Sequence, residues 1–589
     1  MDQHLQLPPE SRLTLFALAE ALTRAGKLSA KNLARLRGVS AYAMHPLVYL
    51  TEQRLPDLSL PGEVHDMDSL LAFLAENTDQ PIYDIDPLRI DVAGISEVMS
   101  RAFAKRHQIL AVEVNADEVV IASADPLVRA WERDLEQVVR RPIKRVLADP
   151  REIARLTDEF YTMAGSVRGA HGAARGDAGS PITNLESMLQ IGSSREPDAN
   201  DQHIVSVVDW LLQYAFEQRA SDIHIEPRRN ISNVRLRIDG VLHSVYELPA
   251  AVGSAVTSRF KILARLDVAE KRRPQDGRLK TRTPEGDEVE LRLSTLPTAF
   301  GEKLVMRIFD PDVLLKSFEE LGLTEHNLSL WEEMIGSGTG IVLVTGPTGS
   351  GKTTTLYSTL RRLATPTVNV CTIEDPIEMV EPAFNQMQVN HGIDLDFASG
   401  VRALMRQDPD IIMIGEIRDL ETAHMAIQAA LTGHLVLTTL HTNDSPGAIS
   451  RLNELGVPAF LIRATVRGVM SQRLVRTLCN SCKQLADTDA AGWQTLVGAA
   501  IPMPAQVYRP VGCRCCRETG YYGREGIYEV LVSTPALQEY IVEGQSTRDI
   551  RRAAMSEGMT PLRLAGARKI ERGETTIEEV LRVAPALED

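Results

Sequence analysis

The spacing of hydrophobic residues divides the chain into segments of different predicted structure. Over residues 1–80, apolar positions recur every three or four residues, as in LTLFALAEALTRAG and SLLAFLAEN. That period is typical of amphipathic helices, so we expect a small helical domain. Over 81–162, short β-rich runs such as ILAVEVNADEVVIASADP alternate with helical runs such as PREIARLTDEFYT. This alternation predicts a compact α/β domain.

The next two segments differ in how much apolar surface they could bury. Residues 163–200 contain AGSVRGAHGAARGDAGSPITN and are rich in Gly, Ala and Ser, so we expect a flexible linker there. Residues 201–312 begin with the helical run HIVSVVDWLLQYAFEQRA and continue with the alternating strands VRLRIDGVLHSVYEL and VELRLSTL. They predict a further α/β domain.

From residue 313 the predicted strands become apolar along their whole length. Such strands occur in GIVLVT, NVCTIED, DIIMIGE and HLVLTTL, and helical patterns separate them. Strands of this kind belong to a mostly parallel sheet that helices cover on both faces. We therefore assign 313–470 to an α/β domain with a parallel sheet, 471–533 to a cysteine-rich region and 534–589 to a C-terminal helical region.

Composition adds limits on domain number and partners. A chain of 589 residues exceeds the size at which one core keeps growing, so three to five domains are expected. The net charge of -15 and the pI of about 5.5 argue against a polyanionic partner, and we expect no nucleic acid. The first residues, MDQHLQLPPE, do not resemble an export signal, and no run of about 18 apolar residues occurs. A cytoplasmic location is therefore expected.

The strongest chemical signal is GPTGSGKT, which follows a predicted strand and precedes a helical run. The pattern is that of a phosphate-binding loop, in which backbone N–H groups surround the phosphates of ATP. Lys352 would reach the terminal phosphates, and the Thr353 hydroxyl would ligate Mg²⁺. The candidate nucleotide-binding residues of this segment are Gly346, Pro347, Thr348, Gly349, Ser350, Gly351, Lys352, Thr353 and Thr354.

A carboxylate at the end of a neighbouring strand is also expected, and DIIMIGE supplies Glu416. Glu416 could orient or deprotonate the attacking water. Gly415 stands where a generic P-loop enzyme has an aspartate that helps to hold Mg²⁺, which leaves the second contact of the metal open.

Two further motifs carry acidic or imidazole groups. TIEDPIE places Glu374, Asp375 and Glu378 within five positions, where they could polarise water or complete a hydrated Mg²⁺ shell. His434 and His441 flank the apolar strand LVLTTL. Either histidine alone would be read as structural, but beside the other motifs both become catalytic candidates.

The cysteines point to a different kind of site. Cys479 and Cys482 form one CxxC pair, and Cys513 and Cys516 form another thirty residues later. Four thiolates at this spacing can surround Zn²⁺ with no open position, so we expect a structural zinc site. Cys515 is an additional thiol inside the second pair, and Cys371 stands alone and should be buried.

The motifs GPTGSGKT, TIEDPIE, RQDPDIIMIGEIRD and TGHLVLTTLHTNDS, in this order, resemble those of the assembly ATPases of type II secretion systems and type IV pili. ASDIHIEP, RIDGVL, KRRPQDGR and LSTLPTAFGEKLVMRIFD extend the resemblance, which spans roughly 200–530. It implies an α/β fold with a RecA-like ATPase domain after a PAS-like domain, and smaller α and α/β domains at the N-terminus. Gly415 in place of aspartate is usual in this family.

The resemblance also implies a homo-hexamer with ATP between the RecA-like domain and the domain before it. Arginines would neutralise phosphate charge there. The candidates carried over by similarity are Arg292 and Arg307 in the preceding domain, and Arg402, Arg406 and Arg418 around the Glu416 strand. Which of them act across subunits stays open.

By the same resemblance, the protein would hydrolyse ATP to ADP and phosphate, with Mg²⁺, to drive pilin or pseudopilin assembly. Its partners would be an inner-membrane platform protein and a membrane assembly protein with a cytosolic face, which would hold it peripherally at the inner membrane. A pilus retraction ATPase and a nucleic-acid translocase are the alternatives. The choice between type II secretion and type IV pili, and cyclic di-GMP binding by the first helices, stay open.

Overall fold

The computed structural model describes residues 10–37, 44–60, 62–87, 90, 94–95, 98–175, 198–284, 286–309 and 316–586. The chain forms two compact units, Met1–Ile308 and Phe309–Asp589. Each unit is described by itself below. No helix among the described ranges is both long enough and apolar enough to cross a bilayer.

The first unit begins with short helices that bury their apolar faces together. Leu18, Leu47, Leu70 and Leu74 are fully buried there. Asp66 and Ser69 cap the last of these helices reciprocally, which fixes where it starts. The helices are α1 Leu15–Arg24, α2 Ala30–Leu36, α3 Pro46–Gln53 and α4 Met67–Thr78.

A small α/β layer follows, as the alternating pattern predicted. Its sheet has the order β1-β2-β3, with β1 antiparallel to β2 and β3 parallel to β2. The elements are α6 Arg101–His107, β1 Ile109–Val114, β2 Val119–Ser123, α7 Ala130–Val139, β3 Ile143–Leu147 and α8 Pro150–Arg175.

Helix α8 extends into the expected linker. It continues to Arg175, so 163–175 is helical where we expected irregular chain. No proline interrupts the chain between Arg151 and Arg175, so the helical hydrogen bonds can continue over this stretch. The rest of the predicted linker, 176–197, lies outside the described residues.

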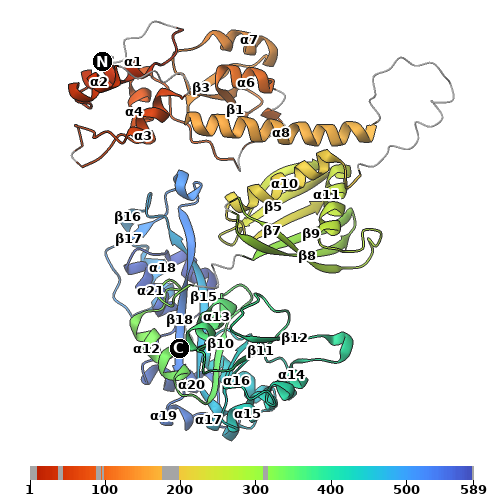
Figure 1. Ribbon diagram of the computed structural model, residues 1–589. Helices are drawn as coiled ribbons and strands as arrows, with labels where there is room; N and C mark the ends of the chain where they lie inside the picture. Colours follow the sequence, from red (N-terminus) through yellow and green to blue (C-terminus); the bar gives the residue numbers. More distant parts are fainter. Residues whose placement is uncertain are drawn as a thin grey trace, which may run out of the picture. The chain divides into compact units, whose positions relative to one another are not determined.

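The second half of this unit is a six-stranded sheet with the order β6-β5-β4-β9-β8-β7. Burial alternates residue by residue along β5, so one face of the sheet is buried and the other is not. Helices α10 and α11 lie beside the sheet (Figure 1). The elements are α10 Gln202–Glu217, β4 Asp222–Pro227, β5 Ile231–Ile238, β6 Val241–Pro249, α11 Ala250–Leu263, β7 Gln275–Arg282, β8 Glu288–Thr298 and β9 Gly301–Phe309.

The second unit is built on a seven-stranded sheet with the order β12-β11-β13-β14-β10-β15-β18. Strands β12 to β15 in this order pair in parallel, and β18 is antiparallel to β15. The strands are β10 Gly340–Thr345, β11 Val370–Glu374, β12 Asn385–Gln388, β13 Ile411–Ile414, β14 Leu435–Leu440, β15 Val466–Leu478 and β18 Tyr521–Val532. The expected parallel sheet is therefore present.

Both faces of this sheet are covered, which explains why its central strands are apolar throughout. Ile341 and Leu343 of β10 enter one core, whereas Val342 and Val344 enter the core on the other face. The helices that cover the sheet are α12 Glu325–Ile335, α13 Lys352–Leu363, α14 Phe397–Leu404, α15 Leu420–Leu431, α16 Ser445–Glu454 and α17 Ala459–Thr465.

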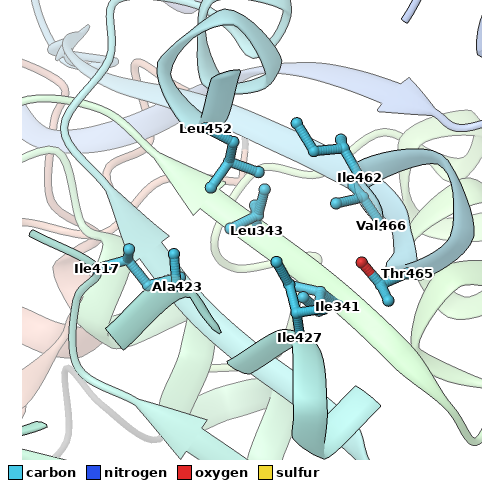
Figure 2. A pocket seen from close by; sticks show the side chains of 9 residues that line it. All are labelled: Ile341, Leu343, Ile417, Ala423, Ile427, Leu452, Ile462, Thr465 and Val466. Atoms are coloured by element: carbon cyan, nitrogen blue, oxygen red, sulfur yellow. The ribbon is translucent and has the colours of Figure 1, made fainter. Parts of the chain in front are cut away.

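A small cavity of about 10 Å³ remains beneath β10 (Figure 2). Ile341 and Leu343 line it from the strand, together with aliphatic side chains of the helices, and Thr465 is its polar member. The Thr465 hydroxyl donates to the carbonyl of Leu461. A space of this size is at the lower limit for one water molecule, so it is a packing void.

Strands β15 and β18 run beyond the other strands and carry the cysteine-rich region at their ends. The predicted boundary at residue 471 therefore falls inside β15, because the strand that pairs with β10 is the same strand that leads to Cys479. The remaining elements are β16 Gln484–Asp487, α18 Ala490–Val497, β17 Gln506–Arg509, α19 Pro535–Gln538, α20 Thr547–Ser556, α21 Leu562–Glu571 and α22 Ile577–Val583.

Candidate functional site

The phosphate-binding loop joins the carboxyl end of β10 to the first turn of α13. Gly349 and Gly351 adopt positive φ angles of 79° and 88°, which glycine tolerates without strain. The Lys352 ammonium donates to the carbonyls of Gly346 at 2.8 Å and Pro347 at 3.1 Å. The loop thus places a cation and a helix N-terminus side by side, an arrangement suited to phosphate.

Lys352 has an unusual proton affinity. Its pKa is lowered to about 8, mainly by burial and also by Arg473, although the nearby Glu416 carboxylate acts in the opposite direction. The cause is the cost of holding an ammonium ion away from water. An anion bound at the loop would offset that cost and favour the charged form.

Glu416 lies at the carboxyl end of β13, the strand that ends at Ile414. One of its oxygens pairs with Arg418, and the other lies 3.3 Å from Nε2 of His441. His441 directly follows β14, so three neighbouring parallel strands bring these groups to one edge of the sheet. We call Gly346–Thr353, Glu416, Arg418 and His441 the nucleotide edge.

The packing around Gly415 gives a physical reason for the missing aspartate. A Cβ atom at this position would lie 3.3 Å from the Ile373 carbonyl and 3.4 Å from the Phe397 ring. The Gly415 backbone is also held by hydrogen bonds to the Ile373 carbonyl and from the Thr439 hydroxyl. Any side chain at this position would therefore be in tight contact with the Ile373 carbonyl.

The three acidic groups of TIEDPIE occupy different surroundings. Glu374 is 3% exposed, and its two oxygens accept hydrogen bonds from the hydroxyls of Tyr357 and Thr372, both at 2.7 Å, and from Gln386. Asp375 is exposed and lies 4.0 Å from Nε2 of His391. The pKa of Arg418 is raised mainly by its hydrogen bond to Glu416, and Asp375 adds a smaller contribution. Glu378 is half-buried in the same loop. Asp375 is thus associated with the nucleotide edge, whereas Glu374 ties β11 to α13.

His434 does not belong to the nucleotide edge. It directly precedes β14, and its carbonyl accepts from the N–H of Gly340, where β10 begins. Its Nδ1 contacts the Ala429 carbonyl at 2.9 Å. The parallel strands separate it from Gly346 by their full length, about 20 Å at the usual rise per residue. Within one chain, His434 and His441 therefore lie at opposite ends of β14, and a catalytic role for His434 stays a prediction.

The candidate arginines are spread over the two units. Arg402 pairs with Glu421 on the surface at 3.3 Å, and Arg406 donates to the Arg402 carbonyl. Arg307 donates to Asp222 at 3.0 Å, and Arg292 lies half-buried on β8; both belong to the first unit. Of the five, Arg418 is the one that the structure brings to Glu416.

The four predicted cysteine ligands meet at one point. The sulfur of Cys479 lies 3.7 Å from that of Cys513, and Cys516 lies 3.7 Å from both Cys482 and Cys513. All four sulfurs lie within 4.8 Å of one another. A zinc ion with bonds of about 2.3 Å to four thiolates holds sulfurs about 3.8 Å apart, so the donor set fits zinc. We call these four residues the cysteine cluster.

Backbone groups and neighbouring residues support this cluster. The N–H groups of Cys513 and Gly520 both point to the sulfur of Cys516 at 3.2 Å, as expected for a ligand that carries negative charge. Cys515 is exposed and is not one of the four. Cys371 is buried, as predicted.

Sequence reasoning missed two residues beside the loop, Gln472 and Arg473 on β15. The Gln472 amide donates to the Ser350 carbonyl at 2.6 Å, and Arg473 donates to the Asn443 carbonyl at 2.6 Å. The sequence feature that could have identified them is the Gln-Arg pair inside the largely apolar run VMSQRLV. Two adjacent polar residues in such a strand point to opposite faces, so at least one of them must face the protein interior.

Comparisons with known proteins identify the same family that the sequence motifs resemble. Residues 197–582 match the family described as type II/IV secretion system protein, and 78–167 match the MshEN domain. The type IV pilus assembly ATPase TfpB of Acinetobacter baylyi is 54% identical over 572 residues, which cover 96% of this chain and 97% of TfpB. The type II secretion system ATPase E of Vibrio cholerae is 44% identical, covering 77% and 85%.

A solved structure is also similar to part of this chain. The pilus retraction motor PilT, crystallised with ADP, is 25% identical and covers 64% of this chain and 97% of its own, with a TM-score of 0.46. The strand order given above, rather than this likeness, defines the fold.

Proposed function

This chain belongs to the family of type II/IV secretion system proteins, and we propose that it is an ATPase that drives the assembly of pilin subunits into a type IV pilus. The observation that carries the proposal is the meeting of Lys352, Glu416 and His441 at the carboxyl ends of neighbouring parallel strands. Ligands of open α/β sheets bind at such strand ends.

Each group at the nucleotide edge has a separate task in this proposal. The loop N–H groups and Lys352 bind the phosphates of ATP, and Thr353 is the residue that would ligate Mg²⁺, with Asp375 available to its hydration shell. Magnesium supplies charge neutralisation at the phosphates. Glu416 orients the attacking water and accepts its proton, and Arg418 and His441 hold Glu416 in place. The products are ADP and phosphate.

The length of the alignments with relatives favours type IV pilus assembly over type II secretion. The pilus ATPase TfpB aligns over almost the whole of both chains, whereas the Vibrio cholerae type II ATPase aligns over 77% of this one. Pseudopilin assembly in type II secretion is the second candidate. A nucleic-acid translocase is disfavoured by the net charge of -15.

The remaining parts of the proposal concern assembly and metal. We infer a homo-hexamer in which Arg292, Arg307, Arg402 and Arg406 serve ATP sites across domain or subunit boundaries. Its partners would be an inner-membrane platform protein and a membrane assembly protein, so that the ATPase acts in the cytoplasm, peripheral to the inner membrane. The cysteine cluster would hold one structural Zn²⁺.

The test combines purified protein with a strain that lacks the native gene. Purified parent protein should hydrolyse ATP in the presence of Mg²⁺, and its gene should restore surface pili to the deletion strain. A deletion strain that keeps its pili but stops secreting exoproteins would move the assignment to type II secretion. Purified protein that neither binds nor hydrolyses ATP would refute the enzymatic proposal.

A further inference from the structure

Strand β15 supplies two buried polar side chains to the wall of the phosphate-binding loop. Gln472 is 1% exposed and Arg473 is 4% exposed. The Gly346 position shows how close the loop lies, because a Cβ atom there would be 2.7 Å from the Gln472 carbonyl and 3.0 Å from Nη1 of Arg473. A loop packed this tightly takes its conformation from β15.

Gln472 contacts both the loop and the helix that follows it. Its amide N–H donates to the Ser350 carbonyl at 2.6 Å, and its amide oxygen accepts from the Thr355 hydroxyl at 2.9 Å. Ser350 is inside the loop, and Thr355 is in the first turns of α13. One side chain therefore fixes the loop relative to the helix whose N-terminus faces the phosphates.

Arg473, the next residue of β15, contacts two other segments as well as its own strand. Its guanidinium donates to the carbonyls of Asn443 at 2.6 Å, Val583 at 3.2 Å and Gln472 at 2.9 Å. Asn443 lies two residues after His441, and Val583 is the last residue of α22. The C-terminal helix is thereby joined to the loop that carries His441.

On the basis of the proposed ATPase function, we propose that Gln472 and Arg473 are positioning residues for ATP hydrolysis. Gln472 sets the conformation of the phosphate-binding loop, and Arg473 holds the loop after β14 so that His441 meets Glu416. Gln472 should therefore affect the dissociation constant of ATP, and Arg473 should affect the catalytic rate constant kcat. Loss of Gln472 weakens ATP binding, and loss of the Arg473 contacts lowers the catalytic rate.

The test compares Gln472→Ala, Arg473→Lys and the control Arg467→Gln in the full chain. Arg467 lies on the same strand but donates to the Thr339 carbonyl near the start of β10, at the other end of the sheet. We expect Gln472→Ala to raise the dissociation constant of a fluorescent ATP analogue about tenfold, the scale of one buried hydrogen bond. Arg473→Lys should lower kcat about tenfold with nearly unchanged ATP affinity, and Arg467→Gln should match the parent.

A double-mutant cycle separates positioning from a general loss of stability. If Gln472 acts through Thr355, the two substitutions should not be additive. Thr355→Val should weaken ATP binding in the parent protein, but it should weaken binding less when Gln472 is already alanine. Should Gln472→Ala not fold, Gln472→Glu keeps the volume and the acceptor but places an oxygen against the Ser350 carbonyl, and the same loss of affinity is expected.

Folded variants within twofold of the parent in both constants would overturn the inference. So would equal losses in all three variants, since those would report stability alone. These outcomes differ from failure of the proposed function, in which the parent itself would neither bind nor hydrolyse ATP.

Discussion

The phosphate-binding loop packs against the middle of β15, and the cysteine cluster begins just after this strand ends, but the side chains of the two sites are held in opposite ways. At the cysteine cluster, four sulfurs already stand at metal-binding distances and two of the four residues are buried. At the nucleotide edge, Lys352 donates to carbonyls of its own loop, and Arg418 and His441 are more than half exposed. A closed ligand set suits a permanent ion, whereas open, rearrangeable contacts suit a ligand that binds and leaves.

The two sites therefore should respond differently to the same perturbation. The part of β15 that pairs with β10 ends at Ser471, before the strand reaches Cys479. The large sheet thus anchors the nucleotide edge, and the ends of β15 and β18 anchor the cysteine cluster. The predictions below perturb one site, or change a residue as a control, and state which site should respond.

The largest effect is expected for Lys352→Ala. Turnover should fall by about three orders of magnitude or more and ATP binding should weaken, because the terminal phosphates lose their cation. The cysteine cluster should be unaffected, so elemental analysis should still find about one zinc per chain. Steady-state ATPase assays with metal analysis check both statements. A turnover within a few-fold of the parent would contradict the role of this loop in ATP hydrolysis.

Raising the pH should weaken ATP binding without releasing zinc. Since burial lowers the pKa of Lys352 to about 8, free protein loses this positive charge as the pH rises through that value. If the charged form alone binds the phosphates, affinity at pH 9 should be about tenfold lower than at pH 7. Titration with ATP at both values measures the change.

Lys352→Arg is the matched control for this pH dependence. A guanidinium stays protonated at both values, so any affinity that this variant retains should not change with pH. An equal loss of affinity in parent and Lys352→Arg would assign the effect to another group.

Cys479→Ser should perturb the cysteine cluster and spare the nucleotide edge. The cluster loses a thiolate, so zinc should be lost and the region around residues 479–520 should become more accessible to protease. ATP affinity should stay within about threefold of the parent, because one lost ligand far along β15 leaves the pairing with β10 in place. Limited proteolysis and ATP titration test this. A large loss of ATP binding would mean that the two sites are one cooperative element.

The smallest effect is expected for Cys515→Ser. Cys515 is exposed and lies outside the four-sulfur cluster, so zinc content, ATP affinity and turnover should all equal those of the parent. The same three assays apply. Loss of zinc in this variant would show that the ligand set differs from the one described here.

The sequence was sufficient to predict the parallel sheet and most of the nucleotide edge, because strand-then-turn motifs encode the carboxyl ends of strands. It also predicted that the four cysteines come together, because two CxxC pairs at this spacing can supply four sulfurs to one point. His434 precedes its parallel strand and His441 follows it, so the two histidines lie at opposite edges of the sheet.

Other features depend on contacts between distant residues, which periodicity does not contain. The burial of Glu374 depends on Tyr357 and Gln386, which approach it from other elements. The length of β15 depends on its antiparallel partner β18, about fifty residues later. Gln472 interrupts an apolar run, and the reason appears when the Ser350 carbonyl is seen beside it.

If Glu416 activates water at the edge where Lys352 binds phosphate, Glu416→Gln should separate hydrolysis from ATP binding. The amide keeps the size of the side chain but cannot accept the proton. ATP affinity and hydrolysis should be measured on the same preparation of this variant. We expect ATP affinity within about threefold of the parent and a turnover at least about a hundredfold lower. A variant that hydrolyses ATP at the parental rate, or one that fails to bind ATP, would contradict it.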